Sequence, residues 1–167
     1  MIKVVQVQIS IESGARSAIR LQNAFLTEGI SSKIVSLQVS PHQLENVFYL
    51  GKKERLTSML DEKIQRTVVK YNKKNYGLFS YPVLGSDISQ HPEVQQADII
   101  YLHWALGGFL NFRSYYKIAA LGKPVIIVLH DMWSLSGGCH YSFTCEKYKT
   151  ECANCQMFPG NTTNDHA

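Results

Sequence analysis

Two side chains able to do acid–base and hydrogen-bonding chemistry, His130 and Asp131, directly follow the apolar run 125–129. Such a run is typical of a buried strand in a parallel sheet. Open α/β sheets bind their ligands just beyond the carboxyl ends of the strands. We therefore predict that His130 and Asp131 are catalytic residues. For Asp131, the cap of a turn or helix is the alternative role.

A cysteine cluster follows a few residues later. All four cysteines of the chain lie within the segment 139–155, in the pattern C-x5-C-x6-C-x2-C: Cys139, Cys145, Cys152 and Cys155. Two residues between cysteines let both sulfurs face one tetrahedral ion, so the closing pair resembles half of a zinc site. The first pair is spaced more loosely, and disulfides or free thiols remain as alternatives. We predict a structural zinc ion bound by the four cysteines.

Two further segments carry candidate substrate-binding residues. His103 and Trp104 end another apolar run and precede a glycine pair; an imidazole and an indole together suit the recognition of a polar ring. The alternative is a core histidine beside a packing tryptophan. Near the amino terminus, Gly14 and Arg16 lie where a helix follows the first strand, a position that favours anions. Glu12 opposes an anion there, and a plain turn is the alternative.

The pattern of apolar residues predicts the elements that position these side chains. We expect strands at 2–10, 32–38, 98–104 and 125–130, the last a central one. We expect helices at 15–28, 54–72, 92–97 and 110–121. Alternation of strands and helices predicts an α/β fold, a Rossmann-like open parallel sheet with helices on both faces. His103 and His130 would then lie at the same sheet edge and share one cleft.

Composition narrows the class of protein. The chain has 167 residues, 45% of them hydrophobic and 18% charged, which is typical of one folded domain. A net charge of +4 with scattered lysines gives no reason to expect a nucleic-acid partner. No signal peptide or membrane-spanning segment is recognisable, which favours the cytoplasm and reduced thiols.

We expect the Rossmann-like domain to occupy residues 1–135. Residues 136–167 would form a cysteine-rich loop and a truncated tail of the same domain. The last residues, G-N-T-T-N-D-H-A, contain neither a closing strand nor a closing helix, so we expect a chain cut in mid-protein.

Three sequence features together resemble a known family: "ADIIYLHW", the glycine pair after it, and "GKPVIIVLHDMWSLSGGCHYSFTCEKYKTECANC". They resemble the N-terminal half of GT4-like bacterial glycosyltransferases, which are retaining enzymes of the GT-B fold. Family members usually open with a Gly-Gly-Ala-Ala-Arg turn, where this chain has Ser13-Gly14-Ala15-Arg16.

The resemblance implies an acceptor-binding N-terminal domain and a C-terminal domain, absent here, that binds the nucleotide-sugar through paired glutamates of an E-x7-E motif. It places His130 near the reacting sugar, with Asp131 beside it, and Arg16 with Gly14 on the phosphate side. No metal is needed at the reaction centre, so zinc would be structural.

We therefore expect half of a transferase that moves a sugar from a nucleotide-sugar to a glycan or lipid-linked acceptor in surface polysaccharide biosynthesis. It would work in the cytoplasm, with peripheral association at the inner membrane face. This fragment alone should be inactive. The alternative is a stand-alone, metal-stabilised α/β binding module without catalysis.

Overall fold

The structure is a computed structural model that describes residues 1–12, 16–42, 44–68 and 77–158. The chain forms two compact units. The first, called the sheet unit below, comprises Met1–Glu62 and Pro82–Val128; the second, the loop unit, comprises Lys63–Tyr81 and Leu129–Ala167. Each unit is described by itself.

The sheet unit contains a five-stranded sheet in the order β3-β2-β1-β4-β5, with every neighbouring pair parallel. Its strands are β1 (Lys3–Gln8), β2 (Ser31–Ser36), β3 (Val47–Tyr49), β4 (Ile99–Leu102) and β5 (Val125–Ile127). This confirms the predicted Rossmann-like open parallel sheet.

The last strand departs from the prediction. β5 was expected to be central because its residues are apolar throughout, but it lies at an edge of the sheet and covers three residues. Ile126 and Ile127 are accordingly 39% and 48% exposed. An uninterrupted apolar run indicates a strand, but it does not set the strand's place in the order of the sheet.

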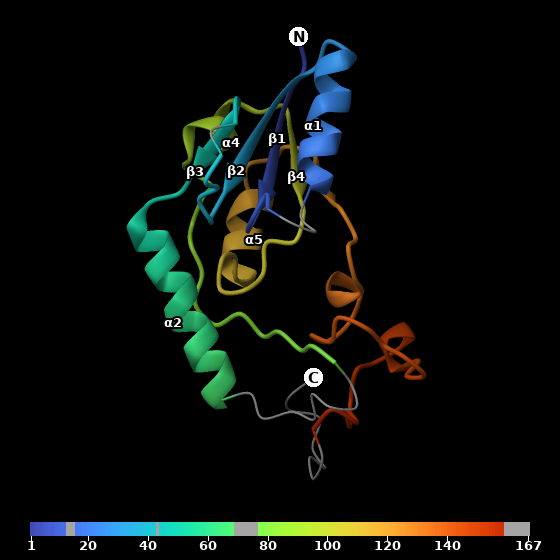
Figure 1. The fold of residues 1–167 in the computed structure, drawn as a ribbon. Helices are drawn as coiled ribbons and strands as arrows, with labels where there is room; N and C mark the ends of the chain where they lie inside the picture. Colours follow the sequence, from blue (N-terminus) through green and yellow to red (C-terminus); the bar gives the residue numbers. More distant parts are fainter. Residues whose placement is uncertain (13–15, 43, 69–76, 159–167) are drawn as a thin grey trace. The chain divides into compact units, whose positions relative to one another are not determined.

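Helices cover both faces of the sheet, as predicted (Figure 1). Helix α1 (Ser17–Thr27) packs on one face, and α4 (Pro92–Gln96) and α5 (Phe112–Ala119) pack on the other. Helix α2 (Lys52–Val68) is a further helix that contributes no residue to these two cores. Because side chains alternate along a strand, β2 presents Ile34 to Ala18 of α1 and Val35 to the opposite core, which receives Val94 of α4 and Ile118 of α5. That larger core holds the sheet unit together.

Helix α2 is attached to the sheet unit by one polar side. Ser58 donates a hydrogen bond to the backbone oxygen of Gly107, and Asp61, fully buried, accepts the backbone N–H groups of Val83 at 2.9 Å and Leu84 at 2.6 Å. No helix in the described ranges is both long and apolar enough to cross a bilayer.

His91 makes the stability of the sheet unit depend on pH. Its Nδ1 accepts the backbone N–H of Glu93 at 3.2 Å and caps the start of α4. Burial lowers the pKa of His91 below its usual 6.5, against the opposing effect of Glu93. The unfolded chain therefore binds a proton at His91 more tightly than the folded protein does. The stabilisation that neutral His91 gives to the fold is complete above about pH 6.5 and is lost as the pH falls below that value.

We expect the free energy of unfolding to decrease between pH 7.5 and pH 5.5, and to decrease less in His91→Asn. Asparagine still accepts the capping hydrogen bond but takes up no proton. Urea denaturation at several pH values measures both slopes. Equal slopes for the two proteins would contradict this role of His91.

Candidate functional site

His130 and Asp131 lie on the loop that follows β5, and both belong to the loop unit. The side chain of His130 is exposed to solvent, whereas that of Asp131 is only 11% exposed. Asp131 Oδ1 accepts the backbone N–H of Trp133 at 2.9 Å, which closes a turn at the start of the 3₁₀ helix Trp133–Leu135. Asp131 thus has the turn-closing role that was its alternative interpretation.

The second oxygen of Asp131 binds a histidine other than its sequence neighbour. Nδ1 of His140 lies 2.6 Å from Asp131 Oδ2, and Nε2 of the same ring lies 2.8 Å from Ser80 Oγ. Because a carboxylate only accepts hydrogen bonds, Nδ1 carries a hydrogen and donates it to Asp131. In the neutral ring, Nε2 then accepts the hydroxyl hydrogen of Ser80. We call Ser80, His140 and Asp131 the polar cluster.

Backbone pairing brings the members of the polar cluster together. The Ser80 N–H donates to the Gly138 oxygen at 2.9 Å, and the His140 N–H donates to the Leu78 oxygen at 3.0 Å. These two bonds flank the antiparallel bridge between Phe79 and Cys139. Ser80 and His140 are therefore diagonal neighbours across the two paired segments, although sixty positions separate them in the sequence.

Two neighbours close the polar cluster from other sides. The indole N–H of Trp133 donates to the Ser80 backbone oxygen at 2.9 Å. Gly138 has φ +132°, and a Cβ there would lie 2.6 Å from the ring of Phe79. A side chain at position 138 would therefore force the two paired segments apart.

The connectivity serine–histidine–aspartate is that of a hydrolase triad, but its burial points to a different role. His140 is 2% exposed and Ser80 8% exposed, so a substrate carbonyl has no room beside the hydroxyl oxygen. The polar cluster instead holds the carboxylate of Asp131, and hence the backbone next to His130, in one position.

Sequence reasoning missed Ser80 and His140. For His140 the sequence offered one sign, namely that it lies next to Cys139, between the His130-Asp131 pair and the other cysteines. Ser80 carried none: it stands in a segment rich in Gly, Ser, Tyr and Pro.

His103 lies in the sheet unit, with its side chain in the core rather than on a surface. The residue is 5% exposed, and its Nε2 lies 2.9 Å from Gln6 Oε1. Gln6, fully buried in β1, in turn donates to Ser32 Oγ of β2 at 3.1 Å. These contacts fit the alternative of a core histidine better than they fit an open pocket for a ring. The cleft shared by His103 and His130 stays a prediction, since the two residues belong to different units.

The other predicted binding residues are less informative. Trp104 is half-buried and packs against the main core, and its backbone oxygen accepts the Ile9 N–H at 3.1 Å. Arg16 is exposed at the N-cap of α1, without a side-chain capping bond. Gly14 lies outside the described residues.

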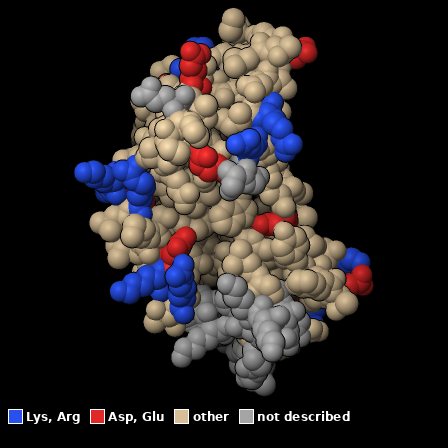
Figure 2. All heavy atoms as spheres, viewed as in Figure 1, with Lys and Arg blue, Asp and Glu red and all other residues tan. Residues whose placement is uncertain are grey.

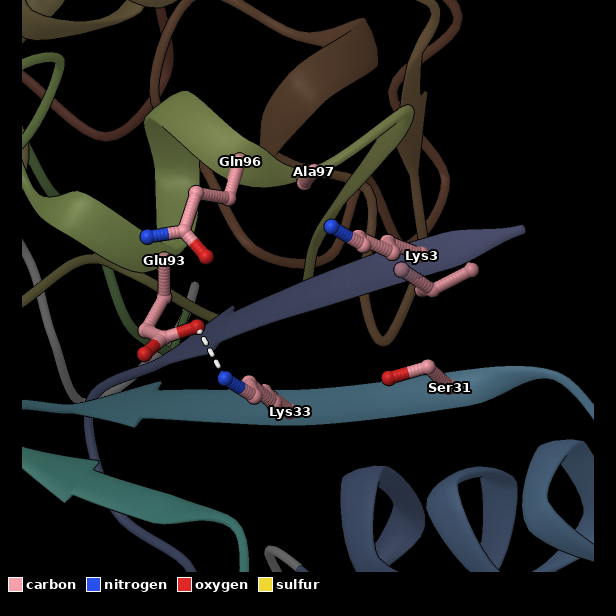
Figure 3. A pocket seen from close by; sticks show the side chains of 7 residues that line it. Lys3, Ser31, Lys33, Glu93, Gln96 and Ala97 are labelled. Atoms are coloured by element: carbon pink, nitrogen blue, oxygen red, sulfur yellow. Dashed lines mark ion pairs between the residues drawn. The ribbon is translucent and has the colours of Figure 1, made fainter. Parts of the chain in front are cut away.

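A small pocket opens at the opposite, amino-terminal ends of β1 and β2, away from every predicted site residue of the sheet unit (Figure 3). Its volume is about 110 Å³, less than the roughly 300 Å³ at which ligand pockets begin. Lys33 at its rim is paired with Glu93 at 2.7 Å. We assign no ligand to it.

All four cysteines carry free thiols and are half-buried in the loop unit. Burial raises the pKa of the Cys155 thiol, and the nearby thiols Cys139, Cys145 and Cys152 raise it further. The four sulfurs are therefore close enough to interact. Among the described residues, however, no three Cys, His, Asp or Glu side chains are grouped as ligands of one ion. The donor chemistry suits zinc, but the described arrangement does not form its ligand set.

Zinc at the cysteines therefore stays a prediction with a direct test. We expect protein purified without reductant and without chelator to contain one zinc per chain, and Cys152→Ser with Cys155→Ser to contain none. Elemental analysis measures the metal, and a thiol count after denaturation in chelator distinguishes the alternatives. Four thiols without metal would indicate free cysteines; two or none would indicate disulfides.

Comparisons of the chain with family models, with curated proteins and with solved structures give no match.

Proposed function

We propose that this chain is the acceptor-side half of a glycosyltransferase that moves a sugar from a nucleotide-sugar to a glycan or lipid-linked acceptor in surface polysaccharide biosynthesis. The fold is compatible with this function, because half of a GT-B enzyme is an open parallel α/β sheet of the kind found here. The stretch 97–155, which contains the segments that resemble the family, includes His130 and two of the three members of the polar cluster, Asp131 and His140.

The observation that carries the proposal is the contrast between His130 and its neighbour. His130 is exposed, whereas Asp131 is held at both carboxylate oxygens. An exposed imidazole on a fixed backbone is organised before its substrate arrives, which is the arrangement that transition-state stabilisation requires.

In this proposal His130 hydrogen-bonds the donor sugar or positions the acceptor hydroxyl, and Asp131 serves as its support. Arg16 contributes positive charge on the phosphate side. The donor would be bound mainly by a second domain with paired glutamates, and the enzyme would work in the cytoplasm. Zinc at the cysteines would shape the loop and take no part in the transfer.

A transfer assay tests the function. The protein that joins these residues to a donor-binding domain is incubated with a panel of radiolabelled nucleotide-sugars and with lipid-linked acceptors. We expect transfer from one donor, and no turnover by residues 1–167 alone. Turnover by the short chain would contradict the two-domain proposal, and absence of transfer from every donor would contradict the enzyme class.

A binding module without catalysis remains the second candidate, favoured by one observation: the buried contact of His103 with Gln6 removes one of the two predicted cleft histidines from solvent. Acceptor binding by residues 1–167 that persists unchanged in His130→Ala, without transfer by the longer protein, would support it.

A further inference from the structure

Helix α2 places a carboxylate beside the turn that follows β4. A Cβ placed on Gly107 would lie 3.4 Å from Oε1 of Glu62 and 3.9 Å from Cζ3 of Trp104. Both side chains belong to the sheet unit. Glu62 is exposed, and Trp104 is half-buried. A hydrogen-bond acceptor from α2 and an indole ring from the end of β4 therefore converge on the same turn.

Contacts of α2 hold Glu62 in this position. Ser58 donates a hydrogen bond to the backbone oxygen of Gly107, and the buried Asp61 accepts two backbone N–H groups of the sheet unit. Glu62 follows Ser58 by four residues, about one helical turn, so both side chains leave α2 on the same side. The carboxylate of Glu62 is therefore carried by a fixed backbone next to Gly107, as a binding site requires.

The order of the strands gives this turn a special place in the sheet. β1 leads through α1 to β2, whereas its neighbour β4 leads through α5 to β5 on the other side (Figure 1). The chain therefore leaves the carboxyl ends of β1 and β4 in opposite directions, and open α/β sheets bind ligands at such a point. Ile9, directly after β1, donates its N–H to the Trp104 oxygen at 3.1 Å, and its Cδ1 would lie 2.9 Å from a Cβ on Gly107. Glu62 thus reaches the point at which the strand order predicts a ligand.

The two side chains select the chemistry of that ligand. A carboxylate only accepts hydrogen bonds, and its two oxygens can take the hydrogens of two hydroxyl groups. The indole of Trp104 offers an apolar surface to C–H groups. A sugar ring combines hydroxyl donors with an apolar face, so it matches both Glu62 and Trp104.

Charged ligands fit this position less well. The negative charge of Glu62 repels a phosphate, which the exposed Arg16 at the start of α1 suits better. A metal cation requires several oxygen ligands together, whereas Figure 2 shows Asp and Glu side chains at separate points of the surface. The ligand beside Glu62 should therefore be uncharged.

We infer that Glu62 and Trp104 bind an uncharged sugar ring of the acceptor, and that Glu62 accepts hydrogen bonds from two of its hydroxyl groups. The inference rests on the proposed function and adds to it the chemical class of the group that the acceptor presents here. It also adds one specificity-determining residue, Glu62.

Saturation-transfer NMR tests the inference with the chain itself. The probes are the methyl glycosides of glucose, galactose, mannose and N-acetylglucosamine, and the 6-phosphates of the same sugars. We expect saturation of the ring protons of at least one glycoside at millimolar concentration, and weaker binding of its 6-phosphate. Glu62→Gln should weaken binding of that glycoside about tenfold, because hydrogen bonds to a charged acceptor are lost. It should also reduce the preference for the glycoside over the 6-phosphate, which a purely structural role of Glu62 would leave unchanged.

Glu28→Gln is the matched control, because it removes the same charge from an exposed residue at the far end of α1. It should bind the glycoside like the wild type. Glu62→Gln removes no buried group, so a thermal melt should give the wild-type midpoint for both variants.

Either of two results would overturn the inference: a wild-type chain that binds none of the glycosides, or a Glu62→Gln chain that binds the glycoside as tightly as the wild type. The transfer assay tests the proposed function separately. Glycoside binding that depends on Glu62, in a protein whose longer form transfers no sugar, would support the sugar site and contradict the transferase.

Discussion

Replacing His130 with alanine is expected to lower kcat for sugar transfer by about a hundredfold, with little change in the KM for the nucleotide-sugar. Loss of one organised hydrogen-bonding group at a reacting centre typically costs a factor of that size. The donor would be bound mainly by another domain, so its affinity should be unaffected. Because the side chain is exposed, its removal opens no cavity, and the midpoint of thermal unfolding should stay within about 2 °C. Steady-state kinetics and a thermal melt measure the two effects.

Ser134→Ala is the matched control, because Ser134 is exposed in the 3₁₀ helix that directly follows this loop. It should leave kcat unchanged. If His130→Ala transferred sugar at the wild-type rate, the assignment of His130 to the reacting centre would be wrong, whatever the function of the protein.

Replacing His140 with alanine is expected to destabilise the loop unit by about 3 kcal/mol. The variant loses both ring hydrogen bonds and leaves the Asp131 carboxylate, 11% exposed, and the Ser80 hydroxyl without their partner. It also leaves a cavity where a ring was 2% exposed. Tryptophan fluorescence during urea denaturation follows the change, because Trp133 is buried and bonded to Ser80.

His42→Ala serves as the control, since the His42 side chain is exposed. Its denaturation midpoint should equal that of the wild type. A His140→Ala protein with the same midpoint as His42→Ala would show that the polar cluster does not hold the loop.

The fold could be predicted from local patterns, within limits that have physical causes. Apolar runs located four of the five strands, and apolar residues that recur every 3.6 positions located the helices around them. Both patterns reflect burial. Strand β3 was missed because Val47–Tyr49 is three residues long and half-buried. The edge position of β5 was missed because strand order depends on contacts between distant segments, which a run of apolar residues does not encode.

The candidate site was harder to predict for the same reason. The sequence pointed to Asp131, but its partner His140 and the third member Ser80 are brought together by backbone pairing across a separation of sixty residues. The burial of His103 depends on Gln6, a polar residue within the first apolar strand. A glutamine in an apolar strand requires a buried hydrogen-bond partner. Gln6 was therefore the one sign in the sequence that a histidine such as His103 lies in the core.

The central claim, that the polar cluster acts on sugar transfer through His130, is tested most directly by a double-mutant cycle on kcat/KM. Ser80→Ala removes one hydroxyl from the polar cluster and keeps the backbone. We predict that it lowers kcat/KM about tenfold in the wild-type background and has almost no further effect in His130→Ala. Equal losses in both backgrounds would contradict the account, because Ser80 would then affect transfer independently of His130.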